Sequence, residues 1–209
     1  MKKQGINAVI LAAGMGRRMG STKQLLTLQG GTVLEQVIRL TLAVPFQRVY
    51  AVIGHEAERI FHEIKVVDPR FRWLINREYH EGQSTSFKLG MEQASQSAEA
   101  VMVLLGDQPF ISSRTIEAVY EQGIRMLSDH DVSFVIQPVY EQKPGHPVLF
   151  GNCPLELFSS ISGDQGAKPV FSEINVKIGV PVDDPGIHFD LDTPEDVENA
   201  KSLHNKARE

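Results

Sequence analysis

The chain has 209 residues, of which 42% are hydrophobic and 22% are charged, as in globular proteins and unlike disordered chains. Its formal net charge of −5 argues against a general nucleic-acid binder, because such proteins carry a basic surface. A single cysteine, Cys153, excludes an internal disulfide and fits a reducing compartment. No apolar run approaches the ~20 residues that span a bilayer. We therefore expect a cytoplasmic protein that binds neither membrane nor nucleic acid.

Short apolar runs alternate with segments of helical periodicity over the first 130 residues. The runs predict buried strands at 6–11, 49–53, 72–75 and 101–105. Each run is followed by a predicted helix, at 33–40, 56–64, 84–94 and 115–127. Such an alternation is typical of a mostly parallel sheet with helices on both faces.

The regular alternation ends after residue 130. A strand is predicted at 132–136, followed by a loop-rich stretch to residue 147 and short helices at 155–161 and 168–174. Two more strands are predicted at 176–182 and 187–191, and Pro194 lies near the first turn of a last predicted helix. Because no linker or repeat interrupts the chain, we expect one α/β domain.

A glycine-rich segment with basic residues, LAAGMGRRMGSTK at 11–23, directly follows the first predicted strand. Carboxyl ends of strands bind ligands in such sheets, and glycines let backbone N–H groups approach a polyphosphate. The spacing fits neither a Walker loop nor a dinucleotide fingerprint. A glycine-rich turn with solvent-facing arginines is the alternative. The predicted nucleotide-binding residues here are Leu11, Ala12, Ala13, Gly14, Gly16, Arg17 and Lys23.

Three aspartates are candidate metal ligands, because Mg²⁺ prefers oxygen ligands. Asp107 follows the fourth strand, where it could also cap a turn, but it lies at the same sheet edge as the glycine-rich segment. Asp190 and Asp192 are two residues apart and would share one face of a strand, completing a divalent-metal site with Asp107. Asp192 or Thr193 could instead cap the last helix. Spacing alone does not decide whether Asp190 or Asp192 contacts the metal, and Asp192 is favoured.

Two further segments carry polar side chains where a ligand could lie. Gly82, Ser84 and Ser86 open a helix after the third strand, where they are either helix caps or contacts to a ribose or base. His146 lies between Gly145 and Pro147 in a rigid loop and is either structural or a substrate contact. The other histidines lack metal-ligand spacing, and no nucleophile elbow is present, so neither a zinc enzyme nor a hydrolase is supported.

Taken together, these motifs resemble the MobA-like nucleotidyltransferases, and especially the molybdenum cofactor cytidylyltransferases linked to purine catabolism and xanthine dehydrogenase maturation. The resemblance spans nearly the whole chain. It rests on LAAG at 11–14 with Lys23, LGDQP at 105–109, GHPVLF at 145–150, GDQGA at 163–167 and DLDTPED at 190–196. The first motif is shared by many nucleotidyltransferases, whereas the GHP and GDQGA stretches are more particular to the cofactor subgroup.

The resemblance implies a single Rossmann-like three-layer domain of the nucleotide-diphospho-sugar transferase type over residues 1–209. Its nucleotide-binding half would be 1–130, and 131–209 would bind the acceptor and complete the metal site. The implied enzyme is a Mg²⁺-dependent transferase that moves CMP from CTP to the terminal phosphate of molybdopterin and releases pyrophosphate. An alanine at position 13 resembles the CTP-using branch of the family.

The implied catalytic residues are Lys23, Arg18 and Asp107, and the acceptor would contact His146, Gly163 and Asp164. A transient complex with a molybdoenzyme is also expected. Two alternatives stay open: a cytidylyltransferase for a sugar or polyol phosphate, and a non-catalytic carrier of the cofactor.

Overall fold

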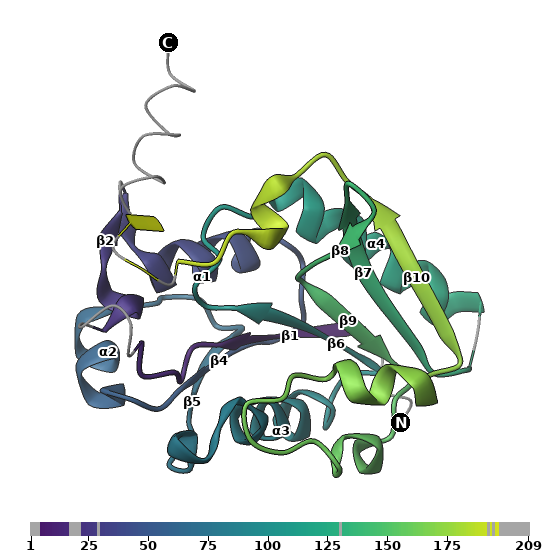
Figure 1. Cartoon of the computed structure of the whole chain (residues 1–209), viewed down its shortest axis with the longest axis horizontal. Coiled ribbons are helices and arrows are strands. Elements are labelled where there is room, and N and C mark those ends of the chain that lie inside the picture. Colours follow the sequence, from purple (N-terminus) through teal and green to yellow (C-terminus); the bar gives the residue numbers. More distant parts are fainter. Residues whose placement is uncertain are drawn as a thin grey trace.

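The computed structural model describes residues 5–16, 22–28, 30–129, 131–191, 193 and 195–196. Its centre is a mixed sheet with the strand order β10-β7-β9-β6-β1-β4-β5 (Figure 1). Four strands of the first half pair in parallel, β6-β1-β4-β5. These strands are β1 (Ile6–Leu11), β4 (Val49–Ile53), β5 (Phe71–Ile75) and β6 (Ala100–Leu105).

Helices cover both faces of this sheet (Figure 1). Alternate residues of β1 face opposite layers, so Ile10 packs in the core beneath α1, α2 and α4 while Val9 packs against α3. The predicted three-layer α/β domain is confirmed, and the first four strand–helix pairs lie within two residues of their predicted ends. The helices are α1 (Val33–Leu42), α2 (Ala57–Glu63), α3 (Gln83–Ala94) and α4 (Ser113–Asp129).

The stretch predicted as loop between residues 137 and 147 contains sheet instead. β7 (Phe134–Tyr140) continues through Pro138 and turns into β8 (Lys143–Pro144). β9 (Val148–Gly151) then runs antiparallel between β6 and β7, while β10 (Val176–Pro181) pairs in parallel with β7. Prolines rarely lie inside central strands, which is why the sequence pattern favoured a loop.

Smaller elements also depart from the predicted ones. The helices predicted at 155–161 and 168–174 are shorter 3₁₀ helices, η3 (Leu155–Phe158) and η4 (Lys168–Glu173). Among the elements that were not predicted at all are η1 (Lys23–Leu25), the β2–β3 hairpin, η2 (Tyr79–Glu81) and the strand β9. The two hairpin strands are β2 (Thr27–Leu28) and β3 (Gly31–Thr32).

The strand predicted at 187–191 is wrong. The segment forms a 3₁₀ turn, η5 (Pro185–His188), and then continues to residue 191 without regular structure. The buried carboxylate of Asp184 causes this, because it accepts hydrogen bonds from Ser112 N–H (2.8 Å), the Thr115 hydroxyl (2.6 Å) and Gly186 N–H (3.0 Å). Asp190 therefore does not lie on a strand, contrary to the prediction that it shares a strand face with Asp192.

Removing the Asp184 carboxylate is expected to destabilise the fold. Asp184→Ala leaves three donors at the start of α4 and in η5 without their acceptor, and we expect the free energy of unfolding to fall by about 2–4 kcal/mol. Urea unfolding followed by circular dichroism measures the change. The adjacent, exposed Asp183→Ala is the matched control, and an equal loss in both variants would contradict this role.

The last predicted helix begins as expected at its described residues. Thr193 Oγ1 accepts a hydrogen bond from Asp196 N–H at 3.2 Å, and the Asp196 carboxylate accepts from Thr193 N–H at 2.7 Å. Asp192 and Pro194 lie outside the described residues, as does the chain beyond residue 196. In the described ranges, no helix combines the length and apolar character that a bilayer span requires.

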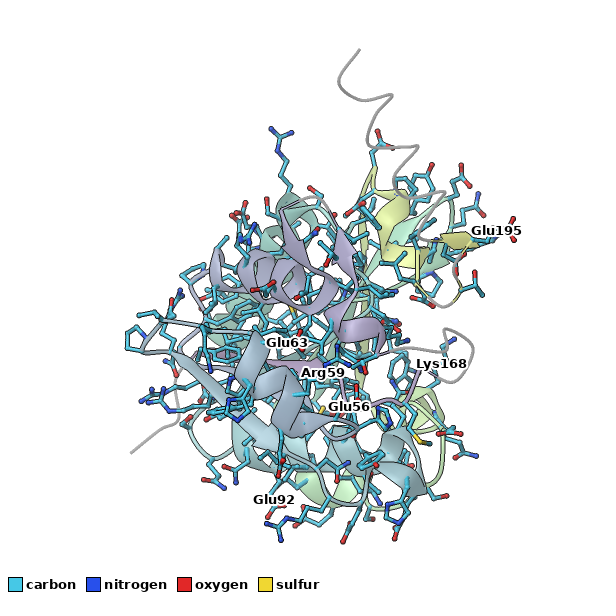
Figure 2. All side chains as sticks on the ribbon, turned by 90° about the vertical axis from the view of Figure 1, so that its left-hand side faces the viewer. Glu56, Arg59, Glu63, Glu92, Lys168 and Glu195 are labelled. Atoms are coloured by element: carbon cyan, nitrogen blue, oxygen red, sulfur yellow. The ribbon has the colours of Figure 1, made fainter. Side chains whose placement is uncertain are left out.

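Exposed charges cluster along α2, where Arg59 lies 2.7 Å from Glu63 and 3.4 Å from Glu56 (Figure 2). All three side chains are more than a third exposed. Ion pairs in contact with water contribute little to stability. These charges are a solvated helix face and supply no candidate site.

Candidate active site

The carbonyl groups at the start of the loop after β1 are engaged within the protein. All four carbonyls of residues 11–14 accept hydrogen bonds: one from Gly106 N–H, one from His55 N–H and two from the side-chain amide of Gln24. Within the described part of the chain, the N–H groups of residues 13–16 form no hydrogen bond. A row of unengaged backbone N–H groups after a strand is suited to binding an anion.

Lys23 and Asp107 form an ion pair beside this loop. Lys23 lies at the start of η1 and Asp107 lies two residues after the end of β6. The ammonium nitrogen of Lys23 is 2.5 Å from Asp107 Oδ2. Their side chains are only 15% and 19% exposed, so the pair is largely shielded from water and from screening salt. The parallel pairing of β1 and β6 brings the two predicted residues together across 84 positions of sequence.

A cavity of about 470 Å³ opens in front of the ion pair and the glycine-rich loop. Ten residues of the predicted site line it: Leu11, Ala12, Ala13, Gly14, Gly16, Lys23, Gly82, Ser86, Asp107 and Asp164. η2 supplies the facing wall through Tyr79, His80 and Glu81. Arg17 and Arg18 lie outside the described residues.

Ser84 and Ser86 differ in their positions. Ser86 lines the cavity and its hydroxyl accepts a hydrogen bond from Asn76 at 2.8 Å. Ser84 is 3% exposed and does not line the cavity; its N–H donates to Gly163 O at 3.0 Å. The structure thus brings Ser86 to the candidate nucleotide pocket and leaves Ser84 in the helix start behind it.

Gly163 and Asp164 close the N-terminus of α3. The Asp164 carboxylate accepts from Gln83 N–H at 3.3 Å, next to the bond between Ser84 and Gly163. Gly82 makes this contact possible, because its φ is +113° and a Cβ there would lie 2.3 Å from the Gly163 carbonyl carbon. Asp164, predicted to contact the acceptor, lines the 470 Å³ cavity.

A second cavity of about 460 Å³ adjoins the first and shares Leu11, Gln83 and Leu105 with it. Most of its walls are apolar, and carboxamides and His146 supply polar edges. Burial lowers the pKa of His146, which favours the neutral form of its imidazole. The apolar lining residues are Phe87, Val103, Val148, Phe150, Ala167, Pro169 and Phe171.

His146 reaches this cavity because β9 is antiparallel. An antiparallel strand begins at the edge where its parallel neighbours end, so residues just before β9 lie near the ends of β1 and β6. Lys168 lies at the start of η4 and is labelled in Figure 2. It lines the same cavity. Residues from both halves of the chain, 1–130 and 131–209, line each cavity.

The structure brings together only part of the predicted set of metal ligands. The Asp190 carboxylate accepts from Gln108 Nε2 at 2.6 Å, and Leu191 N–H donates to Asp107 O at 3.0 Å, so the two acidic segments lie side by side. Asp192 lies outside the described residues. Within those residues, no three His, Cys, Asp or Glu side chains are grouped closely enough to hold a metal.

Three buried polar residues of this region were missed by the sequence analysis: Asn76, Gln24 and Gln108, which are 5%, 2% and 3% exposed. Asn76 holds Ser86 and Thr85 in place. The only available signal was position, because Gln24 follows Lys23 and Gln108 follows Asp107. Polar residues next to functional ones are usually exposed, so adjacency by itself did not indicate burial.

The model of the MobA-like NTP transferase domain matches residues 8–178 of the chain. The chain belongs to this family. The match includes the glycine-rich loop, the Lys23–Asp107 pair and the linings of both cavities. Membership makes the chain a nucleotidyltransferase, as the arrangement of an anion-binding loop and an ion pair also indicates.

Three curated proteins are similar in sequence to this MobA-like chain. Bifunctional protein GlmU of Buchnera aphidicola is 34% identical over 122 residues, which is 57% of this chain and 26% of GlmU, so the chain spans about a quarter of that relative. Purine catabolism protein PucB of Bacillus subtilis is 25% identical over 95% of this chain and 97% of PucB. Molybdenum cofactor cytidylyltransferase of Escherichia coli is 24% identical over 96% and 98%, respectively.

Solved structures share the fold of this MobA-like domain. Rv0371c of Mycobacterium tuberculosis H37Rv superposes with a TM-score of 0.79 at 21% identity, covering 97% of this chain and all of that one. A structure of that protein complexed with manganese gives a TM-score of 0.75 at 19% identity, over 96% and 100% of the two chains.

Proposed function

We propose that this enzyme transfers CMP from CTP to the terminal phosphate of a molybdopterin-type acceptor, with Mg²⁺ as the cation, and releases pyrophosphate. One observation carries the proposal: the Lys23–Asp107 pair lines a polar cavity that directly adjoins an apolar one. The polar cavity suits a triphosphate and the apolar cavity suits an acceptor with a ring system. Full-length similarity to PucB and to the Escherichia coli cytidylyltransferase supports this choice of acceptor.

The triphosphate would bind against the backbone N–H groups of residues 13–16. Four donors in one loop are a favourable site for phosphate oxygens, and Lys23 adds a full positive charge. Arg17 and Arg18 are proposed to contribute further charge at this end. Gly16 would lie close to the phosphates. The base and ribose would extend toward Tyr79, Gly82 and Ser86 on the opposite wall of the cavity.

A divalent cation fits the residues at Asp107, although it needs ligands beyond the chain. Mg²⁺ is commonly bound by one or two carboxylates together with substrate phosphates and water, which agrees with the small number of acidic groups here. Asp107 would hold it, with Asp190 or Asp192 as the second carboxylate. When bound, the cation would neutralise charge on the phosphates.

The acceptor would lie in the apolar cavity with its phosphate directed toward Asp107. An oxygen of that phosphate attacks the α-phosphorus of CTP in line, and the bond from this phosphorus to the pyrophosphate oxygen breaks. Lys23 stabilises the negative charge that grows on pyrophosphate. The phenylalanine-rich walls favour a flat heterocycle over a sugar or polyol phosphate, whose hydroxyls are poorly suited to these apolar walls.

The neutral imidazole of His146 would contact the polar edge of this ring by hydrogen bonding rather than by charge. Gly163 and Asp164 would separate the two substrates, since they are tied to the start of α3 between the cavities. A transient complex with a molybdoenzyme of the xanthine dehydrogenase type, in the cytoplasm, would receive the product.

Pyrophosphate release tests the proposal directly. Molybdopterin acceptor and Mg²⁺ are offered with CTP, GTP, ATP or UTP in separate reactions, and sugar and polyol phosphates replace the acceptor in a second set. We expect release with CTP and the molybdopterin acceptor only. Release with GTP would overturn the nucleotide assignment, and turnover of a sugar phosphate would overturn the acceptor. Binding of the acceptor without any release would favour a carrier.

A further inference from the structure

Each member of the Lys23–Asp107 pair is followed by a buried glutamine that donates two hydrogen bonds. Gln24 Nε2 donates to the carbonyls of Ala12 (2.8 Å) and Gly14 (2.9 Å). Gln108 Nε2 donates to Asp190 Oδ1 (2.6 Å) and, at 3.4 Å, to Ile187 O. The two side chains thus connect the ion pair to two other segments of the site.

The orientation of both carboxamides is determined by their partners. All four partners are carbonyl or carboxylate oxygens, which accept but do not donate, so the amide nitrogen and not the oxygen must face them. The opposite oxygen, Oε1, is buried in both residues and has no hydrogen-bond partner among the described residues. A buried polar atom without a partner is costly. An apolar side chain of similar size would avoid that cost, so filling space does not account for either glutamine.

Their positions indicate separate tasks. Gln24 binds two carbonyls of the glycine-rich loop, whose N–H groups at residues 13–16 stay unengaged among the described residues. Gln108 holds the Asp190 carboxylate, while the backbone of Leu191 is bonded to Asp107. The first set of contacts shapes an anion site, and the second holds two acidic segments together.

We propose that Gln24 and Gln108 are positioning residues with separable effects: Gln24 holds the loop open for the triphosphate, and Gln108 holds the carboxylates that bind the cation. This inference rests on the proposed function of the site. Neither residue is required to touch the reacting atoms. Groups that orient a metal ligand commonly change metal affinity 10–100-fold when they are replaced.

The test uses two binding measurements on the whole chain rather than turnover alone. Calorimetry with EDTA measures CTP affinity without metal, and electron paramagnetic resonance measures Mn²⁺ affinity in the presence of saturating CTP. Gln24→Leu should weaken metal-free CTP binding at least ~10-fold, because the loop is no longer preorganised. Gln108→Leu should leave metal-free CTP binding within about 2-fold and weaken Mn²⁺ binding at least ~10-fold.

Asparagine variants at both positions provide an independent version of the test. Asparagine keeps the amide but is one methylene shorter, so it cannot span both acceptors, and we expect the same pattern of losses in a less perturbed core. Gln96→Leu and Gln96→Asn, at an exposed position after α3, are the matched controls. Circular dichroism checks that each variant is folded.

The outcomes separate this inference from the function on which it rests. Wild-type protein that binds neither CTP nor Mn²⁺ would overturn the proposed function and the inference with it. Wild-type binding together with variants that match the Gln96 controls would overturn the inference alone. Equal weakening of both ligands by both variants would also overturn it, because that pattern indicates general loss of structure instead of separate positioning.

Discussion

Turnover by the Asp107→Ala variant is expected to fall by about 10³-fold with the fold intact. The substitution removes the carboxylate that would hold the cation and that faces Lys23 at 2.5 Å. CTP binding without metal should persist or tighten, because a negative charge next to the triphosphate is lost and Lys23 is released toward the phosphates. Pyrophosphate release and calorimetry in EDTA measure the two effects.

Asp131→Ala is the control for this variant. Asp131 is exposed and precedes β7 at the amino edge of the parallel strands, opposite the site, so its removal should leave turnover unchanged. Normal turnover in Asp107→Ala would remove this residue from the active site. A loss of metal-free CTP binding as large as the loss of turnover would instead assign Asp107 to the structure of the nucleotide pocket.

Replacing Lys23 should have the second-largest effect, with the opposite pattern of binding. Lys23→Ala is expected to lower metal-free CTP affinity and to reduce kcat by about 10²-fold, since the ammonium group would contact the triphosphate and stabilise the leaving pyrophosphate. It also leaves the partly buried Asp107 carboxylate without this cation, which adds repulsion toward the phosphates.

Lys65→Ala controls for the loss of one positive charge. Lys65 is exposed beyond α2, with its ammonium group near Phe61, and its removal should change neither affinity nor kcat. Lys23→Arg tests geometry, because a planar guanidinium does not reproduce a compact ammonium 2.5 Å from one oxygen of Asp107. Full activity of Lys23→Ala would contradict its role at the leaving group.

The first half of the fold and the core of the candidate site could be predicted from the sequence. Continuous apolar runs mark strands buried on both faces, and helical periodicity marks the segments that cover them, so local patterns carry this information. Parallel strands end at one sheet edge. For that reason Lys23 and Asp107 were expected near each other before any distance was known, and the structure places them in contact.

The second half was decided by tertiary structure. β9 is antiparallel inside an otherwise parallel region, and this reversal, which no local pattern encodes, brings His146 to the edge that holds the site. The segment 187–191 has an apolar pattern typical of a strand, yet the contacts of Asp184 with the start of α4 draw it away from the sheet.

The sequence by itself determined the parallel α/β core, the sheet edge at which the candidate site lies and the charged pair placed there. Those features depend on the polarity and spacing of residues close together in the chain. Only the tertiary structure decided that Gln24 and Gln108 are buried and that Asp164 faces the polar cavity. The tertiary structure also decided that a polar cavity adjoins an apolar one. Burial and hydrogen-bond partners depend on segments far apart in sequence, so they become defined only when those segments pack together.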